Sequence, residues 1–151
     1  MREFILDVNV DLKPDQDEYP KYFFDELRTG GDLRLVVGGT DYRAEMKSKR
    51  SLIELIGVLE NSGKLRSVPD AQVDEAQEKL ETKILAVCGE CPKECDDPHI
   101  FALSLISNCM NIISKDIRMA KCRDNIRPKV GHKICPDIRI VSTEAAFKAT
   151  I

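Results

Sequence analysis

Short apolar runs alternate along this chain with longer segments in which apolar residues recur every three or four positions. The short runs, bounded by turn residues, are typical of buried strands, and the longer period is typical of amphipathic helices. The predicted strands are Phe4–Leu6, Leu33–Val37, Lys64–Val68, Met110–Ser114 and Asp137–Val141.

The helical segments are separated by polar loops that contain proline or glycine. Leu52, Leu55 and Leu59 form one clear apolar stripe, and Asp70 and Asp97 stand where N-caps are expected. The predicted helices are Lys21–Arg28, Tyr42–Leu59, Asp70–Val87, Pro98–Ser107, Asp116–Arg123 and Thr143–Ile151. We expect loops at Asp11–Tyr19, Cys88–Asp96 and Arg127–Pro136.

Alternating strands and helices predict an α/β fold with a mainly parallel sheet and helices on both faces. With 151 residues, 42% of them hydrophobic and 32% charged, we expect one domain spanning residues 1–151. No apolar run approaches the roughly 20 residues that span a bilayer, so no membrane contact is expected. The apolar run after Arg2 and Glu3 is too short for a signal peptide. We therefore expect a cytoplasmic protein.

Three carboxylates occupy positions that a parallel sheet would bring together. Asp7 follows the strand Phe4–Leu6, Asp116 follows Met110–Ser114, and Asp97 precedes a helix. All three would lie at the carboxyl edge of the sheet, where open α/β sheets bind ligands. Carboxylates gathered at one place repel each other unless a cation joins them. This pattern predicts a Mg²⁺ or Mn²⁺ site suited to phosphate chemistry.

A fourth acid is expected from the helix that follows the second strand. Glu45 lies in its first two turns, near the same sheet edge, and Glu54 is an alternative further along that helix. Asp96 beside Asp97 leaves a similar choice at the third position.

Basic residues concentrate in one segment of an otherwise acidic chain. The net charge of −3 argues against a general nucleic-acid coat. A local basic segment can hold a phosphate backbone at one place, although a solvated surface explains the same residues equally well. The segment contains Lys115, Arg118, Lys121, Arg123, Arg127, Lys129 and Lys133.

Six cysteines in a cytoplasmic protein are expected to be free thiols. Cys88, Cys91 and Cys95 have the spacing C-x2-C-x3-C, which also suggests a zinc or iron–sulfur site. The fourth ligand of such a site would be His99, Cys109 or Cys122, and the spacing singles out none of them. We favour reduced thiols in a loop. We interpret His99 and His132 as ordinary residues of a helix and a basic loop.

Four short motifs resemble those of PIN-domain ribonucleases. The segment 5–10 (ILDVNV) is similar to the family's "LDTNV" opening, and 97–103 (DPHIFAL) to its "DxxIxAxA" helix. The segment 113–116 (ISKD) is similar to its "vTxD" strand end. Glu45 in 42–46 (YRAEM) matches the acid of its second helical region. Together the motifs cover residues 4 to about 124, in the order that the family has them.

This resemblance implies a three-layer α/β/α sandwich and a Mg²⁺- or Mn²⁺-dependent endoribonuclease, as in toxins of toxin–antitoxin pairs. The implied partners are RNA, an antitoxin protein and a second copy of the chain. The family's metal acids fall on Asp7, Glu45, Asp97 and Asp116. The implied supporting residues are Asn9 and Ser114, and the implied RNA-binding residues are Lys115, Arg118, Lys121 and Arg123. Val8 departs from the family's small polar residue.

Two other functions are compatible with these residues. One is a PIN-fold module that binds RNA or protein without catalysis. The other is a phosphotransfer or phosphatase domain, which also has an aspartate after its first strand. Phosphatases of that type have a second acid two residues on, where this chain has Asn9, so this function is less well supported.

Overall fold

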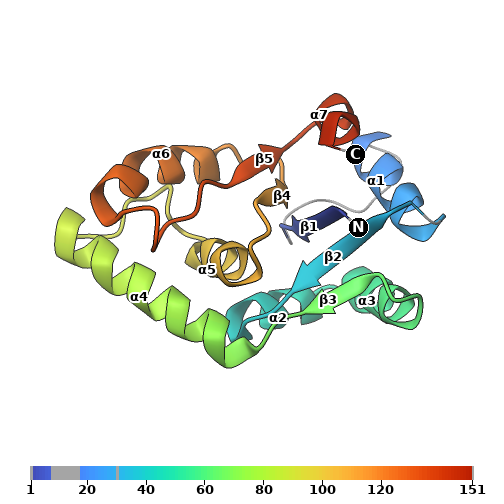
Figure 1. Cartoon of the computed structure of the whole chain (residues 1–151), viewed down its shortest axis with the longest axis horizontal. Helices are drawn as coiled ribbons and strands as arrows, with labels where there is room; N and C mark the ends of the chain where they lie inside the picture. The colour runs from blue at the N-terminus through green and yellow to red at the C-terminus, as the bar shows by residue number, and fades with distance from the viewer. Residues whose placement is uncertain (1, 8–17, 30, 151) are drawn as a thin grey trace.

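A parallel sheet forms the centre of the computed structural model, which describes residues 2–7, 18–29 and 31–150. Within these residues the sheet has five strands in the order β3-β2-β1-β4-β5, and every neighbouring pair is parallel (Figure 1). The strands are β1 (Arg2–Leu6), β2 (Leu33–Val37), β3 (Leu65–Ser67), β4 (Asn111–Ile113) and β5 (Arg139–Val141). The predicted sheet is confirmed.

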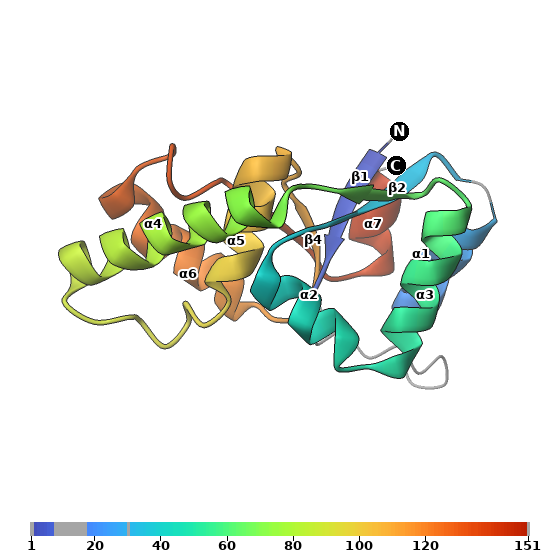
Figure 2. The ribbon, with the colours of Figure 1, turned by 90° about the horizontal axis from the view of Figure 1, so that it is seen from below.

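Helices cover both faces of this sheet, which gives the predicted three-layer α/β/α sandwich. In Figure 2, α4, α5 and α6 lie on one side of the strands, and α1, α3 and α7 lie on the other. The helices are α1 (Glu18–Arg28), α2 (Thr40–Lys47), α3 (Arg50–Asn61), α4 (Asp70–Cys88), α5 (Pro98–Ser107), α6 (Arg118–Val130) and α7 (Glu144–Thr150).

The strand order reverses direction between β1 and β4. The chain moves outward from β1 through β2 to β3, then returns to the other side of β1 with β4 and β5. Ile5 pairs with Ile112 and Leu6 with Ile113 across this junction. Crevices at such a reversal, beyond the carboxyl ends of the strands, are where open α/β sheets bind ligands.

An aromatic cluster joins the two ends of the described chain. Phe4 of β1, Phe23 of α1 and Phe147 of α7 are fully buried, and Phe147 lies 5.2 Å from Phe4 and 5.3 Å from Phe23 between ring centroids. Aromatic pairs at this separation add to the stability that burial provides. The cluster fixes α1 and α7 against one face of the sheet, on the side away from α5.

The helix predicted over Tyr42–Leu59 is wrong as a single element, because α2 ends at Lys47 and α3 begins at Arg50. The backbone amide and the hydroxyl of Ser48 both donate to the Glu45 carbonyl, which closes the last turn of α2. Lys49 is then extended, with φ −123° and ψ 120°. The break separates α2, which carries Glu45, from α3.

Two helix boundaries also differ from prediction. The helix α1 begins at Glu18 and not after Pro20, so part of an expected loop is helical. The helix α6 extends to Val130, through residues expected to form a loop around Pro128. The buried residues of α6 recur at helical spacing. Their burial stabilises this helix more than Pro128 and the charged residues, on which the loop prediction rested, destabilise it. These buried residues are Met119, Cys122, Ile126 and Val130.

No helix among the described residues is long and apolar enough to cross a membrane.

The turn after β2 packs closely against Val68, which follows β3. A Cβ atom on Gly38 would lie 2.5 Å from Val68 Cγ2 and 2.9 Å from the Val68 carbonyl oxygen, so the backbone would have to shift. We expect Gly38→Ala to lower the free energy of unfolding by about 1–3 kcal/mol in urea denaturation. Gly57 lies in α3 with open space around it, and Gly57→Ala should raise stability by about 0.5–1 kcal/mol. Equal effects of the two substitutions would contradict this packing.

Candidate metal centre

The carboxyl ends of β1 and β4 are joined by a buried hydrogen bond. Ser114 Oγ donates to Asp7 Oδ2 over 2.6 Å, and both residues are fully buried. The backbone amide of Asp116 in turn donates to Ser114 Oγ over 2.9 Å. Ser114 thus fixes the carboxylate after β1 and the backbone after β4.

Tyr42 attaches α2 to the same edge. Its hydroxyl donates to the Leu6 carbonyl over 2.7 Å, and its ring is completely buried. Burial raises the pKa of Tyr42 far above its usual value, so the hydroxyl stays a donor. Glu45 lies three residues on, nearly one turn along α2. Tyr42 is the residue that sequence analysis missed here, because its partner is a backbone carbonyl 36 positions away.

Asp97 occupies the N-cap position of α5 but does not act as a cap. Its side chain makes no cap hydrogen bond, and Oδ2 is buried without a hydrogen-bond partner among the described residues. Burial, followed by the nearby charges of Asp96 and Asp7, raises the pKa of Asp97 to about 6, and His99 partly opposes this rise. A buried, unpaired carboxylate oxygen is costly and needs an explanation other than helix capping.

His99 and Glu45 face Asp97 from two helices. Glu45 Oε2 lies 3.1 Å from His99 Nε2, and the His99 residue is 4% exposed. His99 is therefore a buried helix residue, and its ring is part of the cluster. The alternative acid Glu54 is exposed on α3 and pairs with Arg50 over 3.3 Å.

Two overlapping sets of side chains have the spacing of metal ligands. One set is Glu45, Asp97 and His99, and the other is Asp96, Asp97 and Asp116; within each set the ligand atoms lie within 4.8 Å of one another. Asp97 belongs to both. The structure therefore brings together Asp97, Asp116 and Glu45 of the expected acids, with Asp7 close enough to influence the pKa of Asp97.

The donor chemistry of this cluster fits a divalent metal. Mg²⁺ and Mn²⁺ bind carboxylate oxygens and keep water in their remaining positions. Asp97 Oδ2, buried and without a partner in the described structure, supplies an oxygen for such an ion.

Arg118 at the start of α6 is bound within this cluster. Its guanidinium pairs with Asp116 over 2.9 Å and with Asp96 over 3.3 Å. Hydrogen bonds from Arg118 hold the pKa of Asp116 below its usual range. Arg118 thus compensates two of the acids, although sequence analysis assigned it to RNA binding.

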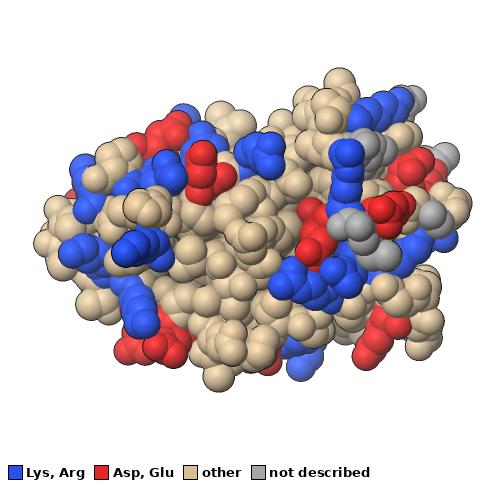
Figure 3. Space-filling model, viewed as in Figure 1, with Lys and Arg blue, Asp and Glu red and all other residues tan. Residues whose placement is uncertain are grey.

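The other expected RNA-binding residues differ in how exposed they are. Lys115 and Lys121 are exposed. Arg123 is engaged, since it donates to the Ile138 carbonyl over 2.6 Å and pairs with Asp124 over 2.9 Å. On the face shown in Figure 3, Lys and Arg are interspersed with Asp and Glu and form no continuous basic patch. Asn9 and Val8 lie outside the described residues.

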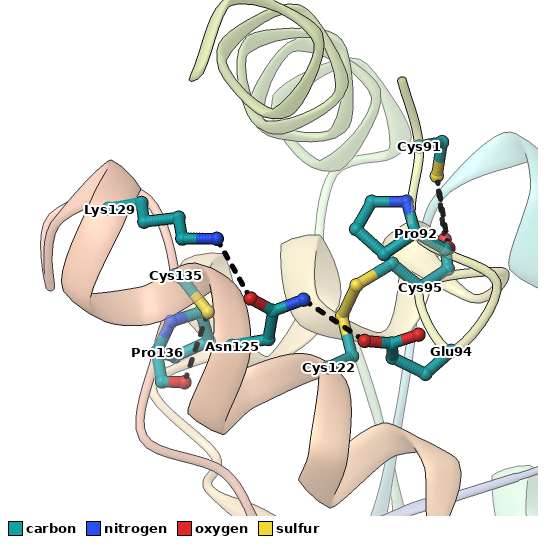
Figure 4. Close-up of a disulfide and its surroundings, with 9 residues drawn as sticks. All are labelled: Cys91, Pro92, Glu94, Cys95, Cys122, Asn125, Lys129, Cys135 and Pro136. Carbon is teal, nitrogen blue, oxygen red and sulfur yellow. Dashed lines mark hydrogen bonds between the residues drawn. A yellow bond between two sulfur atoms is a disulfide. The ribbon is translucent and has the colours of Figure 1, made fainter. Parts of the chain in front are cut away.

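A disulfide anchors the loop that precedes Asp97, which corrects the expectation of six free thiols. Cys95 is bonded to Cys122 of α6, 27 positions away, and both are buried (Figure 4). Asn125 of α6 also donates to Glu94 over 3.0 Å. The packing of the loop against α6 brings the two Cα atoms within 5.1 Å, a distance that a disulfide spans, and chain spacing alone did not reveal this. The cysteines that remain free are Cys88, Cys91, Cys109 and Cys135.

Comparison with known proteins finds similarity in structure only. No protein-family model matches the chain, and no curated protein matches its sequence. A chain in the crystal structure of VapBC2 from Rickettsia felis bound to a DNA fragment from their promoter superposes with a TM-score of 0.51 and 12% sequence identity. The match covers 92% of this chain and 97% of that one. The chain therefore has the PIN-like α/β/α fold that its sequence motifs predict.

Proposed function

We propose that this protein is a metal-dependent endoribonuclease. The observation that carries the proposal is the buried Oδ2 of Asp97, which has no hydrogen-bond partner among the described residues and lies near Asp7, where the strand order reverses between β1 and β4. Asp7, Glu45 and Asp116 surround that point, and an ion there would relieve the repulsion among four acids. The PIN-like fold supports a nuclease more than it supports other phosphate chemistry.

In this proposal Asp7, Glu45, Asp97 and Asp116 hold Mg²⁺ or Mn²⁺. The ion, when bound, would neutralise charge on the scissile phosphate and make a bound water more acidic. Ser114 holds Asp7 and the Asp116 backbone in place. Asn9 follows Asp7 by two residues and would position a carboxylate or water.

The RNA backbone would approach the cluster along the start of α6. Lys115 and Lys121 are exposed there and would contact phosphates, which contributes salt-dependent affinity. Arg118 would exchange an acid for a phosphate when RNA binds. Arg123 already donates to the Ile138 carbonyl and pairs with Asp124, so it would have to exchange these partners to contact RNA.

By analogy with the VapBC2 complex, we propose that the protein acts in the cytoplasm as a toxin neutralised by an antitoxin protein. A homodimer, which the motif resemblance also implies, is part of the same proposal.

A binding module without catalysis is the second candidate. It is favoured by the pairing of Arg118 with both Asp96 and Asp116, which supplies positive charge where a second ion would otherwise bind. If Arg118 stays paired with both acids, the protein would bind RNA or a partner and would not need a metal.

The enzyme proposal predicts loss of RNA cleavage when an acid of the cluster becomes an amide. Asp7→Asn, Asp97→Asn and Asp116→Asn should each reduce cleavage of a mixed RNA substrate in Mg²⁺ or Mn²⁺ by at least about a hundredfold, since each removes a charged ligand. EDTA should abolish cleavage by the wild type. Cleavage is followed on denaturing gels, with circular dichroism to check folding.

Glu54→Gln is the matched control, because Glu54 is an exposed acid of the neighbouring helix α3. It should cut RNA as the wild type does. Folded wild-type protein that is inert with both metals, and free of bound inhibitor, would favour the binding module.

The burial of Asp97 also predicts an unusual effect on stability. The Asp97 pKa of about 6 lies above its usual 3.8, so the charged carboxylate destabilises the fold above pH 6. In EDTA at pH 7.5, Asp97→Asn should raise the free energy of unfolding by about 1–3 kcal/mol. The gain should shrink as the pH falls from about 6 to about 4, because the wild-type carboxyl then takes up its proton in the folded state.

Urea denaturation at several pH values measures this effect, with Glu54→Gln again as the control. An Asn variant less stable than the wild type at pH 7.5 would mean that the carboxylate serves the fold and not a ligand.

A further inference from the structure

We propose that His99 is a nitrogen ligand of the metal centre and that the site therefore prefers Mn²⁺ to Mg²⁺. The inference rests on the proposed function for the location of the metal. It adds a residue and an ion preference that the four acids alone do not imply.

The position of His99 supports a ligand more than a packing residue. Its ring is buried, yet Nε2 points at Glu45 Oε2 from 3.1 Å. A ring nitrogen of His99 also lies within 4.8 Å of a carboxylate oxygen of Asp97. Two carboxylate oxygens and an imidazole nitrogen at this spacing can bind one ion together.

The fold holds His99 in this orientation from both sides. Pro98 begins α5, so His99 lies in its first turn, two residues after Asp97. The Tyr42 ring lies 6.4 Å from the imidazole between centroids. The same Tyr42 is anchored through its hydroxyl to the Leu6 carbonyl. Glu45 of α2 and His99 of α5, which are 54 positions apart in the chain, thus face each other.

The second set of ligands is different in kind. Asp96, Asp97 and Asp116 offer only oxygens, and two of them already pair with Arg118. In the first set Glu45 lies within hydrogen-bond distance of His99, and Asp97 has a buried oxygen without a partner among the described residues. The first set is therefore the better place for the first ion to bind.

An imidazole ligand changes which ion is preferred. Mg²⁺ strongly favours oxygen ligands and gives up its water reluctantly. First-row transition ions accept imidazole nitrogen well, and Mn²⁺ is the member of that series that also binds carboxylates readily. A site of two carboxylates and one imidazole therefore favours Mn²⁺ over Mg²⁺.

The direct test is pulsed electron paramagnetic resonance of Mn²⁺ bound to the untagged wild-type protein without RNA. We expect modulation from a directly bound ¹⁴N nucleus, which His132→Gln should retain and His99→Gln should lose. His132 is exposed and is the other histidine of the chain, so it is a matched control. Because the first spectrum needs no substitution, the test works even where His99→Gln does not fold.

Calorimetric titration of Mn²⁺ and of Mg²⁺ completes the experiment. The wild type should bind Mn²⁺ more tightly than Mg²⁺, and folded His99→Gln should lose about tenfold or more in Mn²⁺ affinity but less in Mg²⁺ affinity. The proposal is overturned by a wild-type spectrum without nitrogen modulation, or by equal affinities for the two ions.

These results can be told apart from failure of the proposed function. A wild type that shows nitrogen modulation from His99 but cuts no RNA supports the ligand and contradicts the nuclease. A wild type that cuts RNA with Mn²⁺ but lacks the modulation supports the nuclease and overturns the ligand.

Discussion

The hydrogen bond from Ser114 to Asp7 connects two strands whose ends are 107 positions apart, and the candidate site is built around it. It is possible only because β4 lies directly beside β1 in the sheet. The hydroxyl of Ser114 also accepts a hydrogen bond from the backbone amide of Asp116. One hydroxyl thus fixes the geometry of two acids at the point where the strand order reverses.

This arrangement concentrates negative charge at a partly buried edge of the sheet. Asp97 bears the consequence, since burial and the charges of Asp96 and Asp7 raise its pKa. Two side chains contact the other acids: His99 lies beside Glu45, and Arg118 pairs with Asp96 and Asp116 and offsets part of their charge. Among the described residues nothing forms a hydrogen bond with the buried Oδ2 of Asp97, so this oxygen could hold a further cation.

A disulfide also stabilises the region that carries the acids. Cys95 lies two residues before Asp97 and is bonded to Cys122, which follows Arg118 by one turn of α6. The disulfide therefore ties the loop bearing two acids to the helix bearing their arginine partner. Sequence spacing suggested Cys88, Cys91 and Cys95 as metal ligands or free thiols. It offered no means of choosing Cys122 as the disulfide partner of Cys95.

The sequence by itself determined the alternation of strands and helices, the parallel sheet and the strand-end positions of Asp7 and Asp116, because these depend on local hydrophobic period and chain order. It also placed Asp97 at a helix start, since Pro98 marks that position. Local rules failed where tertiary contacts outweigh propensity, as in the break at Ser48 and the extension of α6 past Pro128. Only the tertiary structure decided that Asp97 is not a cap, that Glu45 and not Glu54 meets His99, and that Arg118 binds acids. Those outcomes depend on how helices far apart in the chain pack at one sheet edge, and no residue's neighbours in sequence record that.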